Sequence, residues 1–128
     1  MGITVVFSGK KIIGVRGEKI GAFFLEKRGY SIIHKNFFTK FGEIDLIAKK
    51  AKMLAFVEVK TRIANNKKLS EKPEAAISKG KYFKIRKSVE IFIFKNPKYI
   101  DFDLKIHAIS IFLNQKTARV RFLKNVFY

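Results

Sequence analysis

The sequence predicts a mixed α/β fold, in which helices pack on a β-sheet. Two stretches have the apolar spacing of amphipathic helices, and five others alternate apolar and polar residues as half-buried strands do, in the order α-β-β-β-α-β-β. The chain has 128 residues, 48% of them hydrophobic, which is enough to bury one core. We therefore expect a single domain over residues 16–128. Residues 1–15 form a lead-in that is either an added edge strand or a flexible segment.

The first four elements follow from local patterns. A helix is expected at residues 16–28, where apolar residues recur at helical spacing and Gly29 can end the helix. A strand at residues 30–38 follows. Two more strands are expected at residues 42–48 and 54–62. The connection between these two is short, so we expect an antiparallel hairpin.

The second half of the chain is expected to form a helix followed by two strands. A polar loop at residues 63–72 precedes a second helix, which we expect to begin at Pro73 and to end before Asn96. The last two strands are expected at residues 102–113 and 118–127.

Positive charge dominates the composition. The chain has 28 Lys and Arg against 10 Asp and Glu, a formal net charge of +18. Such a field attracts polyanions. Nucleic acid, with DNA ranked first, is the expected partner, because Lys and Arg bind its phosphates and release condensed counterions. An anionic membrane surface ranks lower, because the basic residues are not gathered on one amphipathic helix. No apolar run approaches the length of a membrane span, so we expect no membrane partner and a cytoplasmic location.

The chemistry open to this chain is narrow. It has no Cys, which excludes disulfides, thiol nucleophiles and thiolate zinc sites. Its two imidazoles, His34 and His107, lie far apart in sequence. A site for a hard cation, built from carboxylates, is the main metal option that remains.

Acidic residues are concentrated where strands are expected. Three of the ten, Glu43, Asp45 and Glu58, fall within sixteen positions on the two strands of the hairpin. Asp in particular is disfavoured in strands. These positions would be easier to fill with Thr or Val if folding alone mattered, so we take the carboxylates to be functional.

The hairpin brings these groups together. Alternation puts Glu58 and Lys60 on one face of their strand. On the other strand it puts Glu43 and Asp45 on one face, opposite Ile44 and Leu46. Pairing across the turn then lets Asp45 lie beside Glu58. Two close carboxylates repel each other unless a cation lies between them, and Mg²⁺ or Mn²⁺ prefers such oxygen ligands. The alternative is a plain hairpin whose acids pair with surface lysines.

Two longer motifs carry a family resemblance. They are Phe41-Gly42-Glu43-Ile44-Asp45-Leu46-Ile47 and Phe56-Val57-Glu58-Val59-Lys60-Thr61-Arg62. With looser matches from Gly17 to the C-terminus, they resemble the YraN family, a largely uncharacterised bacterial group in the restriction-endonuclease-like superfamily. The resemblance implies a restriction-endonuclease-like fold, a mixed β-sheet flanked by helices.

The same resemblance assigns roles. The superfamily's active-site pattern, a carboxylate followed by (D/E)-x-K, corresponds here to Asp45, Glu58 and Lys60. It implies that Asp45 and Glu58 bind Mg²⁺ or Mn²⁺ with the carbonyl of Val59, and that Lys60 assists the attacking water. Similarity to archaeal Holliday-junction resolvases adds an acid on the first helix, which is Glu18, in a metal-facing or water-positioning role. The plain alternative for Glu18 is a favourable carboxylate in a helix's first turn.

Other residues receive lesser roles. Glu43 is expected beside the metal ligands, where it either supports them or holds a nearby Lys or Arg. Arg62, Lys67 and Lys68 follow the second motif and are candidate contacts for backbone phosphates. Lys81 is another candidate contact, although an ordinary solvated helix lysine explains it slightly better.

These expectations converge on a metal-dependent nuclease that hydrolyses phosphodiester bonds in DNA. Branched or structured DNA is the substrate implied by the resolvases, whose dimers also make a homodimer an expectation. The alternative is a non-catalytic nucleic-acid-binding module that retains the nuclease fold, because a net charge of +18 explains binding without chemistry. A basic protein assembled onto RNA or the ribosome is a third interpretation.

Overall fold

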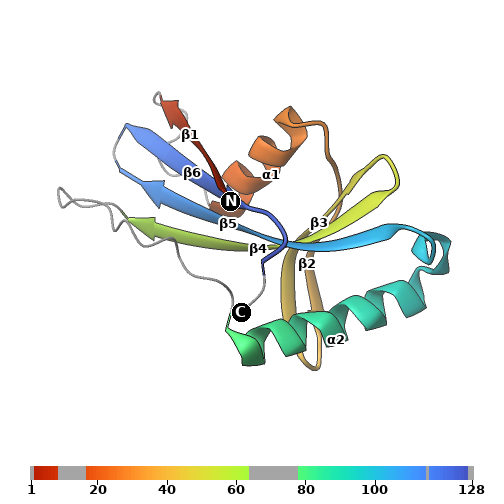
Figure 1. Ribbon diagram of the computed structural model, residues 1–128. Helices are drawn as coiled ribbons and strands as arrows, with labels where there is room; N and C mark the ends of the chain where they lie inside the picture. The colour runs from red at the N-terminus through yellow and green to blue at the C-terminus, as the bar shows by residue number, and fades with distance from the viewer. Residues whose placement is uncertain (1, 9–16, 64–77, 115, 127–128) are drawn as a thin grey trace.

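The described part of the protein is built on one six-stranded sheet, on which the helices pack (Figure 1). The computed structural model describes residues 2–8, 17–63, 78–114 and 116–126. Their elements are β1 (Gly2–Ser8), α1 (Gly17–Lys27), β2 (Ser31–Thr39), β3 (Gly42–Lys50), β4 (Met53–Ile63), α2 (Lys79–Lys95), the 3₁₀ turn η2 (Pro97–Tyr99), β5 (Asp103–Leu113) and β6 (Thr117–Leu123). From α1 onwards the order is the one expected from the sequence, and β1 pairs antiparallel with β6 at the edge.

The strands lie in the order β1-β6-β5-β4-β3-β2. Neighbours pair antiparallel except β4 and β5, which are parallel and are connected through α2. The expected antiparallel hairpin of β3 and β4 is confirmed. Its connection spans only two residues, Ala51 and Lys52, and Ala51 has a positive φ of 54°.

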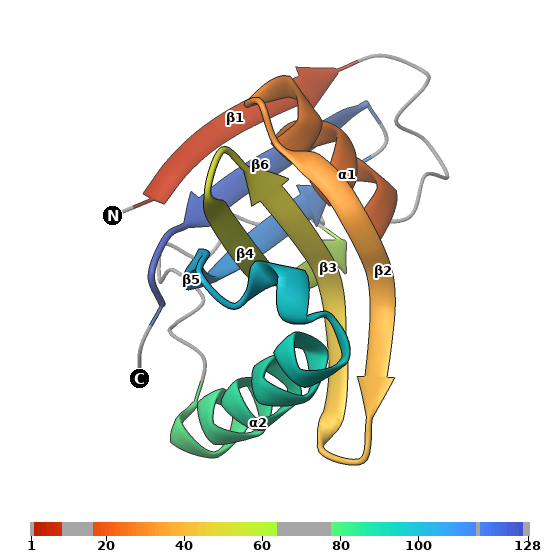
Figure 2. The ribbon, with the colours of Figure 1, turned by 90° about the vertical axis from the view of Figure 1, so that its right-hand side faces the viewer.

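The two helices cover opposite faces of the sheet (Figures 1 and 2). The cluster on the α1 side contains Ile20, Phe24, Leu25, Leu46, Val57, Ile109, Ile111, Val120 and Phe122 among others. The cluster on the α2 side contains Phe37, Ile44, Ile47, Leu54, Phe56, Ile85, Val89, Phe92 and Ile93 among others. Central strand β4 contributes to both clusters by simple alternation. This mixed sheet with a helix on each face is in keeping with the restriction-endonuclease-like fold, and that prediction is confirmed.

Strand β2 breaks its alternation near its middle. His34 and Phe37 both pack edge-to-face against Phe92 of α2, although residues three apart in a regular strand point to opposite faces. Asn36 lies between them with a φ of 53°, a left-handed conformation that Asn tolerates better than most residues. The left-handed backbone at Asn36 therefore changes the face of the sheet to which Phe37 points, so that Phe37 lies on the same side as His34.

Strand β3 breaks its alternation opposite that point. Ile44 and Ile47 both belong to the α2-side cluster, whereas Leu46 belongs to the α1-side cluster. Our expectation that Ile44 and Leu46 share a face is therefore wrong. The break lies at Asp45, which register would place across from Asn36. Alternation within β3 could not show this change of facing, because the unusual backbone conformation opposite it, at Asn36, lies on the neighbouring strand.

Helix α2 begins later than the sequence suggested. Ser78 is its N-cap, with extended backbone and with a hydroxyl that accepts the N–H of Lys81 at 3.2 Å. The expected start, Pro73, lies outside the described residues. At the other end, the side-chain amide of Asn96 donates to the carbonyl of Phe92 at 2.9 Å. Neither α1 nor α2 has the length and apolar content needed to cross a membrane.

Candidate metal centre

The candidate centre lies where β3 and β4 part. Their ladder ends at the pair Leu46 and Val57, although both strands continue beyond it. The next position on β3 is Asp45, only 9% exposed, whose Oδ2 accepts the N–H of Val59 at 2.8 Å. A carboxylate thus takes the place of a backbone acceptor, which satisfies a strand N–H and fixes the orientation of Asp45.

Close packing brings Glu18 to this fork. A Cβ on Gly17 would lie 1.7 Å from Oγ1 of Thr61, so only glycine allows the start of α1 to rest on β4 at this point. Glu18 follows directly in the first turn of α1. One carboxylate oxygen from each of Glu18, Glu43 and Asp45 lies within 4.8 Å of the others.

The electrostatics of this cluster favour a cation. The pKa of Asp45 is raised to about 7, first by burial and then by the charges of Glu58, Glu18 and Glu43, while the hydrogen bond from Val59 opposes the shift. Three ion pairs among the described residues join Lys81 to Glu58, Lys87 to Glu90 and Lys105 to Asp103, and none of these three includes a clustered carboxylate. Three oxygen donors of this kind suit Mg²⁺ or Mn²⁺, and such an ion would offset the repulsion.

Glu58 lies next to the cluster but is not one of its three members. It is also 9% exposed, and its Oε2 lies 2.5 Å from Nζ of Lys81 at the start of α2. Extension of the β3–β4 register places Glu58 across from Asp45, as expected from the sequence. However, Glu58 follows Phe56 on the α2 side of β4, whereas Asp45 turns toward Glu18 of α1.

A hollow of about 550 Å³ opens between the fork and α2. Acids lie on its strand side and basic groups on its helix side. Its lining residues are Phe41, Gly42, Glu43, Asp45, Glu58, Ser78, Gly80, Lys81, Lys84, Ile85 and Ser88. A cation held by the carboxylates would face two lysines across this space, an arrangement that suits a phosphate group bound between them.

The remaining predicted residues are more dispersed. Lys60 is exposed on β4 and is not among the residues that line the hollow. Arg62 is exposed near the end of the same strand. Val59, expected to offer its carbonyl, reaches the site through its N–H. Lys67 and Lys68 lie outside the described residues.

Sequence reasoning gave some residues too small a role or none. Glu43, expected only beside the ligands, is a full member of the carboxylate cluster. Its position two residues before Asp45 was the signal. Lys84 was not singled out, yet it lines the hollow one helical turn after Lys81. Its spacing from Lys81 could have revealed it.

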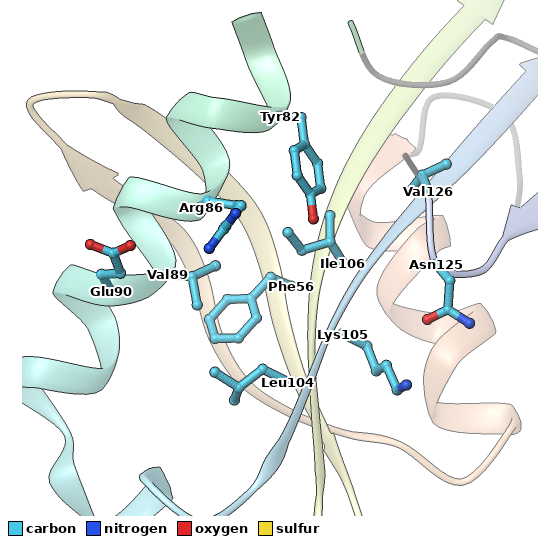
Figure 3. A pocket seen from close by; sticks show the side chains of 10 residues that line it. All are labelled: Phe56, Tyr82, Arg86, Val89, Glu90, Leu104, Lys105, Ile106, Asn125 and Val126. Atoms are coloured by element: carbon cyan, nitrogen blue, oxygen red, sulfur yellow. The ribbon is translucent and has the colours of Figure 1, made fainter. Parts of the chain in front are cut away.

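A second hollow, of about 600 Å³, lies between α2 and β5 (Figure 3). Figure 3 shows Phe56 between the helix and the strand, with Tyr82, Arg86 and Val89 of α2 on one side. Among the described residues, Glu90 is the only acidic one in its lining. This hollow therefore lacks the donor set of the first one.

Comparison with known proteins gives the family. The model described as "Uncharacterised protein family UPF0102" matches residues 17–122. The chain belongs to the UPF0102 family. The YraN resemblance is thereby confirmed. The matched segment contains all four acids of the fork as well as Lys60 and Lys81.

Several UPF0102 relatives are similar along most of their length. A protein of Caldanaerobacter subterraneus subsp. tengcongensis is 41% identical over 105 residues, which cover 82% of this chain and 83% of the relative. One of Clostridium botulinum (strain Loch Maree) is 36% identical over 119 residues, covering 91% and 94%. One of Syntrophomonas wolfei is 30% identical over 115 residues, covering 90% and 96%. Their names give the UPF0102 family and no activity.

Proposed function

We propose that this UPF0102 protein is a metal-dependent nuclease that hydrolyses phosphodiester bonds in DNA. The observation that carries the proposal is the cluster of Glu18, Glu43 and Asp45 at the fork. Two of its members, Glu43 and Asp45, line a hollow that Lys81 and Lys84 of α2 also line. Its setting in a chain of net charge +18 adds the attraction for a polyanion. The (D/E)-x-K motif of the restriction-endonuclease-like superfamily supports the same activity.

In this proposal each side chain has a distinct task. Glu18, Glu43 and Asp45 hold Mg²⁺ or Mn²⁺, which supplies an activated water and stabilises negative charge at phosphorus. Asp45 is kept in place by the N–H of Val59. The carbonyl of Val59 is a further donor toward the ion.

Lys81 acts on the phosphate and Lys60 acts on the water. Lys81 exchanges the carboxylate of Glu58 for a phosphate oxygen of the substrate, which frees Glu58 to face the ion. Lys60, on the same face of β4 as Glu58, orients the attacking water. Arg62, Lys67 and Lys68 contact backbone phosphates further along the substrate.

A cleavage assay tests the proposal. Purified protein is incubated with Mg²⁺ or Mn²⁺ and with branched, duplex or single-stranded DNA. We expect cleavage that requires the ion and that falls at least about a hundredfold in Asp45→Ala and in Glu58→Ala. Asp103→Ala is the matched control, because Asp103 is an exposed carboxylate that pairs with Lys105 away from the fork. Undiminished cleavage in the two site variants would contradict the assignment.

A non-catalytic binding module is the second candidate, and the net charge of +18 is the feature that favours it. Calorimetric titration with Mn²⁺ separates the two candidates. The nuclease requires an ion site that Asp45→Ala removes, whereas a pure binder needs none. Both predict DNA affinity that falls steeply with salt. The homodimer suggested by the resolvases stays a prediction, and light scattering in solution tests it.

A further inference from the structure

Phe38 is a large aromatic side chain in solvent beside the carboxylate cluster. It is 70% exposed, although it lies within β2. Its cross-strand partner is Glu43 of β3. Directly opposed residues of an antiparallel pair project to the same face with Cβ atoms about 5 Å apart. Phe38 therefore stands next to one of the three carboxylates of the candidate metal centre.

The turn that follows Phe38 is tied to α2. Oγ1 of Thr39 accepts the N–H of Phe41 at 3.0 Å, and the same hydroxyl shares a 2.7 Å hydrogen bond with Oγ of Ser88. Ser88 is only 1% exposed, within the buried stripe of α2. These bonds hold the β2–β3 turn in one position, which lowers the cost of ordering the turn when Phe38 contacts a ligand.

The same turn contributes a second ring and a positive charge. Phe41 lines the hollow together with Asp45 and Glu58, and Nζ of Lys40 lies 5.4 Å from the centroid of its ring. One edge of the candidate centre is therefore made of two aromatic rings and a lysine, held on a short turn. This combination of stacking surface and positive charge is what proteins use to hold single-stranded nucleic acid.

We infer that the β2–β3 turn is a stacking platform for an unpaired nucleobase, with Phe38 as its main contact. The inference deepens the proposed function and rests on it: the substrate carries unpaired nucleotides beside the phosphate to be cleaved. A base inside an intact duplex has both faces covered by its neighbours, so it cannot stack on Phe38 without being displaced. An unpaired base offers a free face, and aromatic stacking accepts any base.

Phe94 provides a matched control on the same molecule. It is 86% exposed, more than Phe38, and it lies near the end of α2. Thirteen residues of helix, about 20 Å, separate it from Lys81 at the hollow. Substitution of either Phe removes an exposed ring of the same size. Only Phe38 stands beside the cluster.

The experiment measures binding without cleavage. Fluorescence anisotropy in a chelator compares fully paired duplex DNA with the same duplex carrying a central unpaired bubble that contains 2-aminopurine. For the wild type we expect tighter binding to the bubble and quenching of the 2-aminopurine. Phe38→Ser should lose about tenfold in affinity for the bubble, less than twofold for the duplex, and the quenching. Phe38→Tyr should behave as the wild type, and Phe94→Ser should change neither affinity.

Equal losses on bubble and duplex, no loss on the bubble, or the same loss in Phe94→Ser would overturn the inference. Because no metal is present, the result is independent of catalysis. Metal-dependent cleavage without an effect of Phe38 leaves the nuclease and removes the platform. A Phe38 effect specific to the bubble, in a protein that never cleaves, leaves the platform on a binding module.

Discussion

Asp45 and Glu58 are two carboxylates that are equally buried on neighbouring strands, each 9% exposed, yet their surroundings differ. Glu58 has a lysine within contact distance, whereas Asp45 has two further acids and a single N–H. Burial first, and then the charges of Glu58, Glu18 and Glu43, raise the pKa of Asp45 to about 7 against the opposing hydrogen bond from Val59. The lesson is that the fold compensates one acid with its own cation and leaves the other in a form that an external cation would stabilise.

The largest expected effect comes from removing the uncompensated charge. Because the pKa of Asp45 is raised, its contribution to folding stability is present below about pH 4 and is lost as pH rises toward 7. Asp45→Asn stays neutral and keeps an acceptor for Val59. We expect it to be more stable than the wild type by roughly 2–4 kcal/mol at pH 8 without metal. Denaturant unfolding from pH 4 to pH 8 measures the difference.

The control for this experiment is Asp103→Asn at an exposed carboxylate, where we expect a change in stability below about 1 kcal/mol at pH 8. Addition of Mn²⁺ should stabilise the wild type but not Asp45→Asn, because a ligand stabilises only the state that binds it. If Asp45→Asn is less stable than the wild type at pH 8, the charge of Asp45 is compensated after all.

A smaller effect on stability is expected from moving helix α1, which holds Glu18 in the cluster. Gly17→Ala places a methyl group 1.7 Å from Oγ1 of Thr61, so α1 must shift away from β4. We expect a loss of about 1–3 kcal/mol in the free energy of unfolding and weaker binding of Mn²⁺, because Glu18 moves with the helix. Gly80→Ala is the control, since nothing lies within 4 Å of its added Cβ. Calorimetry on both variants decides whether the position of α1 matters to the ion.

The smallest effect tests the compensated acid. Lys81→Met removes the cation that pairs with Glu58, so that Glu58 then resembles Asp45. The lysine is about half exposed, so the loss of stability should be only about 1 kcal/mol. Affinity for Mn²⁺ should rise severalfold, because Glu58 is then available to the ion. Lys87→Met, which removes a half-buried lysine 4.0 Å from Glu90, is the control. Unchanged affinity for Mn²⁺ would mean that Glu58 takes no part in binding the ion.

Several features could be predicted from the residues alone. Alternation in β4 correctly separates Phe56 from Val57 and Val59, because a central strand buried on both faces keeps a regular pleat. Strand β3 could not be predicted in the same way, because its change of facing at Asp45 lies across from Asn36 of β2, whose φ of 53° no pattern within β3 reveals. The pairing of Glu58 with Lys81 was equally hidden, since these residues are joined only when α2 returns to the sheet.

The order of the strands and helices, the family and the carboxylates available for chemistry follow from the residues, because these depend on local pattern and residue type. Which carboxylates meet depends on how the elements pack. Glu18 reaches Asp45 because Gly17 packs against Thr61, and Glu58 is drawn to α2 by Lys81. Distances between side chains on separate elements depend on how those elements pack, and no spacing along the chain specifies them.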